Sequence, residues 1–134
     1  MAVTTSPSEA DPDSGLAVID ETHLRRMTLG NRRLENEILE IFTRQTTIML
    51  GRMSSADIDL VAAAAHTMLG SARGIGAWRV ARSAERLQDA AGNGNGPDLD
   101  IALEDLKAAA LEARAAIGAR QRPIAATRSR KHRA

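Results

Sequence analysis

Residues 58–91 read IDLVAAAAHTMLGSARGIGAWRVARSAERLQDAA, and this stretch carries the clearest evidence of the fold class. Apolar residues recur at steps of three and four on both sides of a glycine-containing break at residues 73–76. The first half contributes Ile58, Val61, Ala65, Met68 and Ala72, and the second half Ala77, Val80, Ala84, Leu87 and Ala91. Such spacing places these residues on one face of an α-helix. The stretch therefore predicts two amphipathic helices joined by a short connection, which makes them antiparallel neighbours.

Two more helices are predicted on the N-terminal side of this stretch. A short one covers residues 21–29, because Asp20 can cap its first turn and Gly30 can stop it. A longer one begins after Asn31, which can cap it, and ends near Met53. Its predicted buried face consists of Leu34, Ile38, Ile41, Phe42, Gln45, Ile48 and Met49.

Capping and turn residues also indicate where the other helices begin and end. Ser54 followed by Asp57 resembles a capping box for the helix that carries Ile58 and Val61. Residues 92–97, GNGNGP, predict a loop. Asp98 opens the last helix and Gly118 fits its C-cap. The predicted buried face of that helix consists of Leu99, Leu103, Leu106, Ala110, Ala113 and Ile117.

Composition supports an all-α protein. The 134 residues include one Trp, one Phe and no Tyr, whereas a sheet needs aromatic and β-branched residues. The absence of Cys excludes a disulfide scaffold, a cysteine-ligated zinc site and a thiol nucleophile. Four amphipathic helices with short connections predict an up-down-up-down antiparallel four-helix bundle, with a short additional N-terminal helix and disordered tails.

Three segments follow from this pattern. Residues 1–16 are expected to be a disordered N-terminal arm, residues 17–119 the four-helix bundle, and residues 120–134 a basic C-terminal tail. The tail contains six Lys and Arg residues and no acid, which leaves 12 basic and 17 acidic residues in the rest of the chain. Nucleic-acid binding by the bundle is therefore disfavoured, although an accessory role through residues 120–134 stays open.

Two sequence features bear on the expected cellular location of the protein. No apolar run approaches the roughly 20 residues of a membrane span. The first residues have neither the basic start nor the apolar stretch of a secretory signal. We expect a cytoplasmic protein without membrane contact, and a monomer, because one bundle uses most of the apolar faces.

His66 needs a separate explanation because it lies off the predicted buried face, about 100° around the helix from Ala65. Its neighbours one turn away are Ala62, Ala63, Leu69 and Gly70, most of them very small. A helical glycine costs about 1 kcal/mol relative to alanine, so close approach of a partner is a reason for Gly70. A neutral imidazole near pH 7 has a free lone pair and can act as a nucleophile. The alternative is an ordinary surface histidine.

The segment Ala65-His66-Thr67-Met68-Leu69-Gly70-Ser71-Ala72, followed by Gly74-Ile75-Gly76-Ala77, resembles the histidine-containing phosphotransfer (HPt) domain of bacterial two-component phosphorelays. The segment Ala84-Glu85-Arg86-Leu87-Gln88 is similar to the family's continuation on the next helix. The resemblance covers roughly residues 17–118. It implies a four-helix bundle that carries a phosphoryl group between receiver domains of response regulators.

The resemblance also implies site roles. His66 would accept the phosphoryl group from a receiver phospho-aspartate and pass it to another receiver. Gly70 would expose the imidazole, Ser71 would occupy the family's small or hydroxyl position, and Gln88 would hydrogen-bond one ring nitrogen. The domain would need no cofactor and have no kinase activity of its own, since Mg²⁺ and the acidic pocket belong to the partner receiver. A hybrid sensor histidine kinase would lie upstream.

One position departs from the family pattern, because Leu69 stands where the family usually has Lys. A leucine one turn from His66 cannot balance phosphoryl charge. Arg73 on the same helix is one candidate replacement, and Arg79 and Arg82 on the next helix are others. Arg73 could equally be a cation that favours the helix C-terminus. The departure leaves open a degenerate domain that binds receivers or kinases without transferring phosphate.

Overall fold

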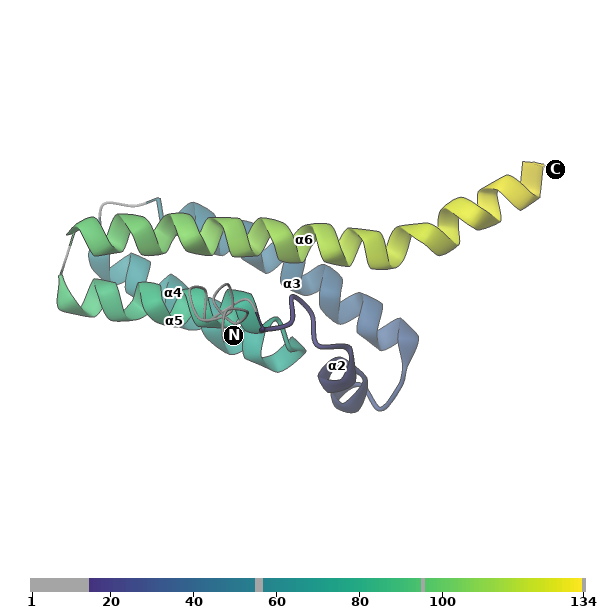
Figure 1. The fold of residues 1–134 in the computed structure, drawn as a ribbon, viewed down its shortest axis with the longest axis horizontal. Helices are drawn as coiled ribbons and strands as arrows, with labels where there is room; N and C mark the ends of the chain where they lie inside the picture. The colour runs from purple at the N-terminus through teal and green to yellow at the C-terminus, as the bar shows by residue number, and fades with distance from the viewer. Residues whose placement is uncertain (1–14, 55–56, 95, 134) are drawn as a thin grey trace, which may run out of the picture.

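The computed structural model describes residues 15–54, 57–94 and 96–133, and the side chains among them up to Gln121. The described residues form five helices and no strand. These are α2 (Glu21–Met27), α3 (Arg32–Arg52), α4 (Ile58–Ile75), α5 (Trp78–Asn93) and α6 (Gly96–Arg133). The helices α3 to α6 run alternately up and down as a four-helix bundle, and α2 lies across one end (Figure 1). None of the described helices meets the length and hydropathy of a membrane span.

Three side-chain caps explain where helices begin. Asp20 accepts a hydrogen bond from the backbone N–H of His23, and Asn31 accepts one from that of Leu34, each at 3.0 Å. Both predicted caps are therefore confirmed. The capping box at Ser54 is wrong, because Asp57 itself caps α4 by accepting from the N–H of Asp59 at 2.9 Å. In each case a side-chain oxygen satisfies a first-turn donor that has no helical partner.

The predicted buried faces of α4, α5 and α6 agree well with the structure. All five residues predicted on α5 are buried, and Ile58 at the exposed start of α4 is the exception on that helix. On α6, Leu99 and Leu103 are half-buried at the open end of the bundle, and the other four residues are buried. Alanines at many of these positions let the helices approach closely.

The predicted buried face of α3 is wrong by about one residue. Glu35, Leu39, Phe42, Thr46 and Met49 are buried, of which only Phe42 and Met49 were expected. Ile41 and Ile48 are instead 54% exposed. The predicted and the observed buried faces both have helical periodicity. The prediction considered apolar residues and therefore left out Glu35 and Thr46. Glu35 can be buried because other helices supply its partners.

Glu35 is 2% exposed, and its carboxylate accepts two hydrogen bonds, one from each of two other segments. The hydroxyl of Thr28 donates to its Oε2 at 3.1 Å, and Arg120 donates to its Oε1 at 2.6 Å. Arg120 also donates to Glu21 at 2.9 Å. Burial raises the pKa of Glu35, but the hydrogen bonds from Arg120 and Thr28 and the Arg120 charge outweigh it and hold the pKa below its usual value.

These contacts correct the predicted C-terminal boundary. Helix α6 does not end at Gly118 but continues to Arg133, beyond the rest of the bundle (Figure 1). Arg120 accordingly belongs to the body of the protein and not to a solvated tail. At the other end, Leu16 of the expected arm has a bundle contact, since its carbonyl accepts from Arg79 Nε at 2.9 Å. Residues 1–14 lie outside the described residues.

The turn between α4 and α5 holds α2 in place. Gly76 has φ +83°, and its carbonyl accepts from the N–H of Asp20 at 2.9 Å. The Trp78 indole donates to Asp20 Oδ2 at 2.8 Å and meets the His23 ring edge-on at 5.1 Å. The Trp78 and His23 hydrogen bonds hold the pKa of Asp20 below its usual value. Trp78 therefore closes this end of the bundle.

Arg120→Ala should lower the free energy of unfolding by about 3 kcal/mol at pH 7, because Glu35 then stays buried without its cation. Glu35 with a lowered pKa stabilises the fold above its unfolded pKa of about 4.3, and this contribution disappears as the pH falls through the folded value. The cost of Arg120→Ala should therefore be smaller at pH 3. Urea unfolding at both pH values measures it, with the exposed Arg114→Ala as a control. Equal costs for the two variants at pH 7 would contradict the role of the pair.

Gly76→Ala should destabilise the protein more than Gly30→Ala, although both glycines have a positive φ. A Cβ at residue 76 would lie 2.9 Å from the Asp20 Cβ, whereas one at residue 30 would meet nothing within 4 Å. Both substitutions impose left-handed strain of roughly 1–2 kcal/mol, and only Gly76→Ala must also displace α2. Thermal unfolding of the two variants compares them, and equal melting temperatures would show that α2 yields freely.

Candidate functional site

The site centres on His66, an exposed residue near the middle of α4. Its ring nitrogen Nδ1 lies 3.2 Å from the side-chain amide of Gln88 on α5. A rotation of that amide by 180° exchanges its oxygen and nitrogen, so Gln88 can either donate to Nδ1 or accept from Nδ1–H. Among the described residues the other ring nitrogen, Nε2, has no hydrogen-bond partner. The structure thus joins two residues that the sequence predicted to meet and leaves Nε2 accessible.

Small residues surround the imidazole on its own helix. Ala63 and Gly70 are exposed and Ala62 is half-buried. A Cβ added at Gly70 would meet no atom within 4 Å. The described structure therefore excludes a close helix–helix crossing as the reason for this glycine. What remains is a helix surface that lets a large partner reach the ring.

Leu69 does not share the exposed face of His66, contrary to expectation. Its side chain is 8% exposed and lines a cleft of about 200 Å³ between α4 and α5, together with Leu16, Trp78 and Ala81. Residue 69 lies about 60° from residue 66 around the helix, on the side that faces α5. A leucine at this position therefore packs against the neighbouring helix.

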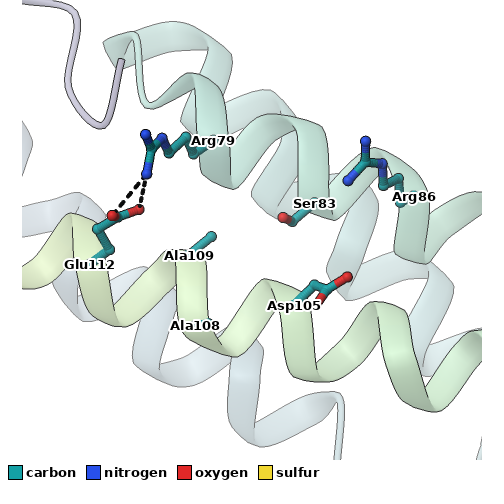
Figure 2. Close-up of a pocket in the computed structure, with 7 residues that line it drawn as sticks. All are labelled: Arg79, Ser83, Arg86, Asp105, Ala108, Ala109 and Glu112. Atoms are coloured by element: carbon teal, nitrogen blue, oxygen red, sulfur yellow. Dashed lines mark hydrogen bonds and ion pairs between the residues drawn. The ribbon is translucent and has the colours of Figure 1, made fainter. Parts of the chain in front are cut away.

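The three arginines proposed as substitutes for the missing Lys have different surroundings. Arg79 points toward α6, where it binds both carboxylate oxygens of Glu112 at 2.9 and 3.0 Å (Figure 2). Arg73 and Arg82 both contact Glu85, at 3.7 and 3.4 Å respectively. Arg73 and Arg82 thus line the cleft between α4 and α5 together with Glu85, whereas Arg79 is directed to α6.

Ser71 is not brought to His66. Its hydroxyl donates to Gln45 Oε1 of α3 at 2.6 Å, on the other side of α4. Ser71 thus connects α4 to α3. The predicted small or hydroxyl residue is present at this position, but it has no contact with the His66 ring.

Glu85 is the residue of this site that sequence reasoning missed. It lies one turn before Gln88 on α5, so the pairing of Gln88 with His66 was the signal that could have located it. The described residues contain no group of three or more His, Cys, Asp or Glu side chains suited to a metal ion. The site thus consists of one accessible imidazole, one amide and a cluster of ion pairs.

Comparisons with known proteins agree with this geometry. The model of the Hpt domain family matches residues 33–116, which include His66, Gly70 and Gln88. An X-ray structure of a rice protein described as a histidine-containing phosphotransfer protein matches with a TM-score of 0.68. The two chains are 15% identical, the match covers 86% of each, and the likeness concerns the fold. No curated protein sequence matches the chain. The matched domain spans well over half of the chain and contains the whole candidate site, so this protein belongs to the Hpt domain family.

Proposed function

We propose that this protein is a phosphorelay intermediate that carries a phosphoryl group on Nε2 of His66. The group arrives from the phospho-aspartate of one receiver domain and leaves to the aspartate of another response regulator. The observation that carries the proposal is the pairing of His66 Nδ1 with Gln88, which leaves Nε2 of this exposed residue without a hydrogen-bond partner among the described residues. Membership of the Hpt family supports a role in phosphotransfer.

The chemistry requires one tautomer of the imidazole. When Nδ1 keeps the proton and donates it to Oε1 of Gln88, the lone pair is on Nε2. This lone pair attacks the phosphorus of the acyl phosphate, so that an N–P bond forms, the P–O bond breaks and the aspartate carboxylate leaves. The Nδ1 proton stays in place throughout. Gln88 is therefore a positioning residue that selects the reactive nitrogen.

The partner supplies what this chain does not. Hpt domains are phosphocarriers and not enzymes, and we propose that Mg²⁺ and the acidic pocket lie on the receiver. A hybrid sensor histidine kinase would then be the source of the phosphoryl group. This scheme places the protein in the cytoplasm as a monomer that docks on one receiver at a time.

A second candidate function is a binding module that docks on receivers or kinases without carrying phosphate. Leu69 favours it, since the side chain is buried and leaves no cation within one turn of His66 on α4. The two candidates differ in one measurable property. A phosphorelay intermediate acquires acid-labile phosphate from a phosphorylated receiver, and a pure binding module does not.

His66→Gln should abolish phosphoryl uptake and leave the free energy of unfolding within about 0.5 kcal/mol of the wild type, because the exposed ring fills no cavity. The measurement is acid-labile label after incubation with a phosphorylated receiver, with His23→Gln as a control that keeps the nucleophile. Label on the His66→Gln variant would refute the assignment of the residue. A wild type that binds receivers but takes no label would establish the binding module.

Gly70→Leu should slow phosphoryl transfer at least about tenfold, because a branched side chain beside His66 obstructs the approach of a receiver. The substitution raises helix propensity by up to about 1 kcal/mol, so the fold should not suffer. Gly51→Leu is the matched control, since Gly51 is an exposed helical glycine with open space around it on α3. The measurements are the phosphoryl-transfer rate and the melting temperature of both variants. Equal transfer rates would mean that access across residue 70 is not required.

A further inference from the structure

Three charged residues, Arg73, Arg82 and Glu85, form a cluster of ion pairs between α4 and α5. Arg73 on α4 lies 3.7 Å from one carboxylate oxygen of Glu85, and Arg82 on α5 lies 3.4 Å from the other. The side chains of Arg73 and Glu85 are 56% and 40% exposed, so solvent reaches the pair. An exposed ion pair at this distance contributes little to stability. The cluster is therefore easily rearranged.

The helix register directs Arg73 toward His66. The contacts 66–88 and 73–85 show that α4 and α5 run antiparallel, so Glu85 is approximately level with Leu69. Helical side chains lean toward the N-terminus of their own helix, so the Arg73 guanidinium extends from its Cα in the direction of His66. It thereby covers part of the roughly 10 Å that separate the levels of residues 66 and 73 along the helix.

A phosphoryl group on Nε2 would change the charge balance at this place. It carries about two negative charges near neutral pH. Glu85 lies one turn before Gln88 on α5 and Asp89 directly follows Gln88, so two acidic residues of α5 lie near the level of His66. Within one turn of His66 on α4, Leu69 is buried and no residue carries a positive charge. The first cation beyond this turn of α4 is Arg73, nearly two turns from His66.

On the basis of the proposed function, we propose that Arg73 is the phosphoryl-binding cation of this protein and that Glu85 holds it until His66 is phosphorylated. Arg73 then exchanges a single long contact with Glu85 for a bidentate pair with the phosphoryl oxygens, which is the stronger interaction. Arg82 stays with Glu85 and continues to balance its charge. Before phosphorylation, Arg73, Arg82 and Glu85 line the same cleft of about 200 Å³ as Leu69 and Ala81.

The experiment follows the Nε–Hε resonance of each arginine by NMR while His66 is phosphorylated with phosphoramidate, a small-molecule donor that needs no receiver. The His66→Gln variant controls for labelling of other histidines. The Arg73 resonance should shift on phosphorylation more than that of Arg114, an exposed arginine of α6. An Arg73 resonance that does not move would overturn the proposal.

The lifetime of the phosphohistidine gives an independent measurement. Arg73→Ala should shorten it about two- to fivefold at low salt, the range expected of one partly exposed charge pair, and Arg114→Ala should not change it. Glu85→Gln should lengthen it more when Arg73 is present than in the Arg73→Ala background. Asp89→Asn removes the same charge from the same helix and should show no such dependence on Arg73. A Glu85→Gln effect independent of Arg73 would mean that Glu85 acts by repulsion alone, and would overturn its holding role.

The same samples separate this proposal from the proposed function. If phosphoramidate labels His66 and Arg73 responds, but no phosphorylated receiver labels the protein, the transfer role is wrong and the assignment of Arg73 stands. If receivers label His66 and neither the resonance nor the lifetime depends on Arg73, the transfer role stands and the assignment of Arg73 is wrong.

Discussion

The close antiparallel packing of α4 against α5 is the constraint on which the rest of the molecule depends. Buried alanines bring the two helices together, among them Ala65 and Ala72 on α4 and Ala81 and Ala84 on α5. The short connection through Gly76 and Ala77 sets their register. That register places Gln88 beside His66 and Glu85 beside Arg73. Larger side chains at the alanine positions would separate the helices and remove both contacts at once.

The ends of this helix pair are held by residues remote in sequence. Asp20 connects α2 to the Gly76 turn and to Trp78, so the position of the turn does not depend on α4 and α5 alone. Arg120 connects α6 to Glu21 and to the buried Glu35, which holds α3 against the same end of the bundle. These polar contacts fix the register of α4 and α5, which the small alanine side chains allow to pack closely. The helix surface around His66 carries small residues.

The charge arrangement beside His66 differs from the one expected of a domain with a lysine one turn from the histidine. Leu69 turns into the cleft between α4 and α5, where an ammonium would be poorly solvated, and the cations lie further along the cleft in contact with Glu85. An apolar residue at position 69 thus strengthens helix packing and moves the positive charge away from the imidazole. The ion pairs of Glu85 can therefore exchange partners, because exposed ion pairs rearrange at little cost in free energy.

The sequence by itself determined the fold class and the helices of the bundle and marked His66 as the candidate site, because helical periodicity, capping residues and a glycine beside an off-face His66 are local properties of the chain. The meeting of Gln88 with His66 was implied by the resemblance to the HPt family and is present in the structure. The rotation of α3 could not be predicted, because burying Glu35 in place of Ile41 depends on Arg120, 85 residues away. The places of Leu69 and Glu85 in the cleft between α4 and α5 could not be predicted either. A helix rotation of one residue is enough to move a side chain from the cleft to the solvent. Only the tertiary structure supplies such partners, because the free energy of burying a polar group depends on what lies opposite it.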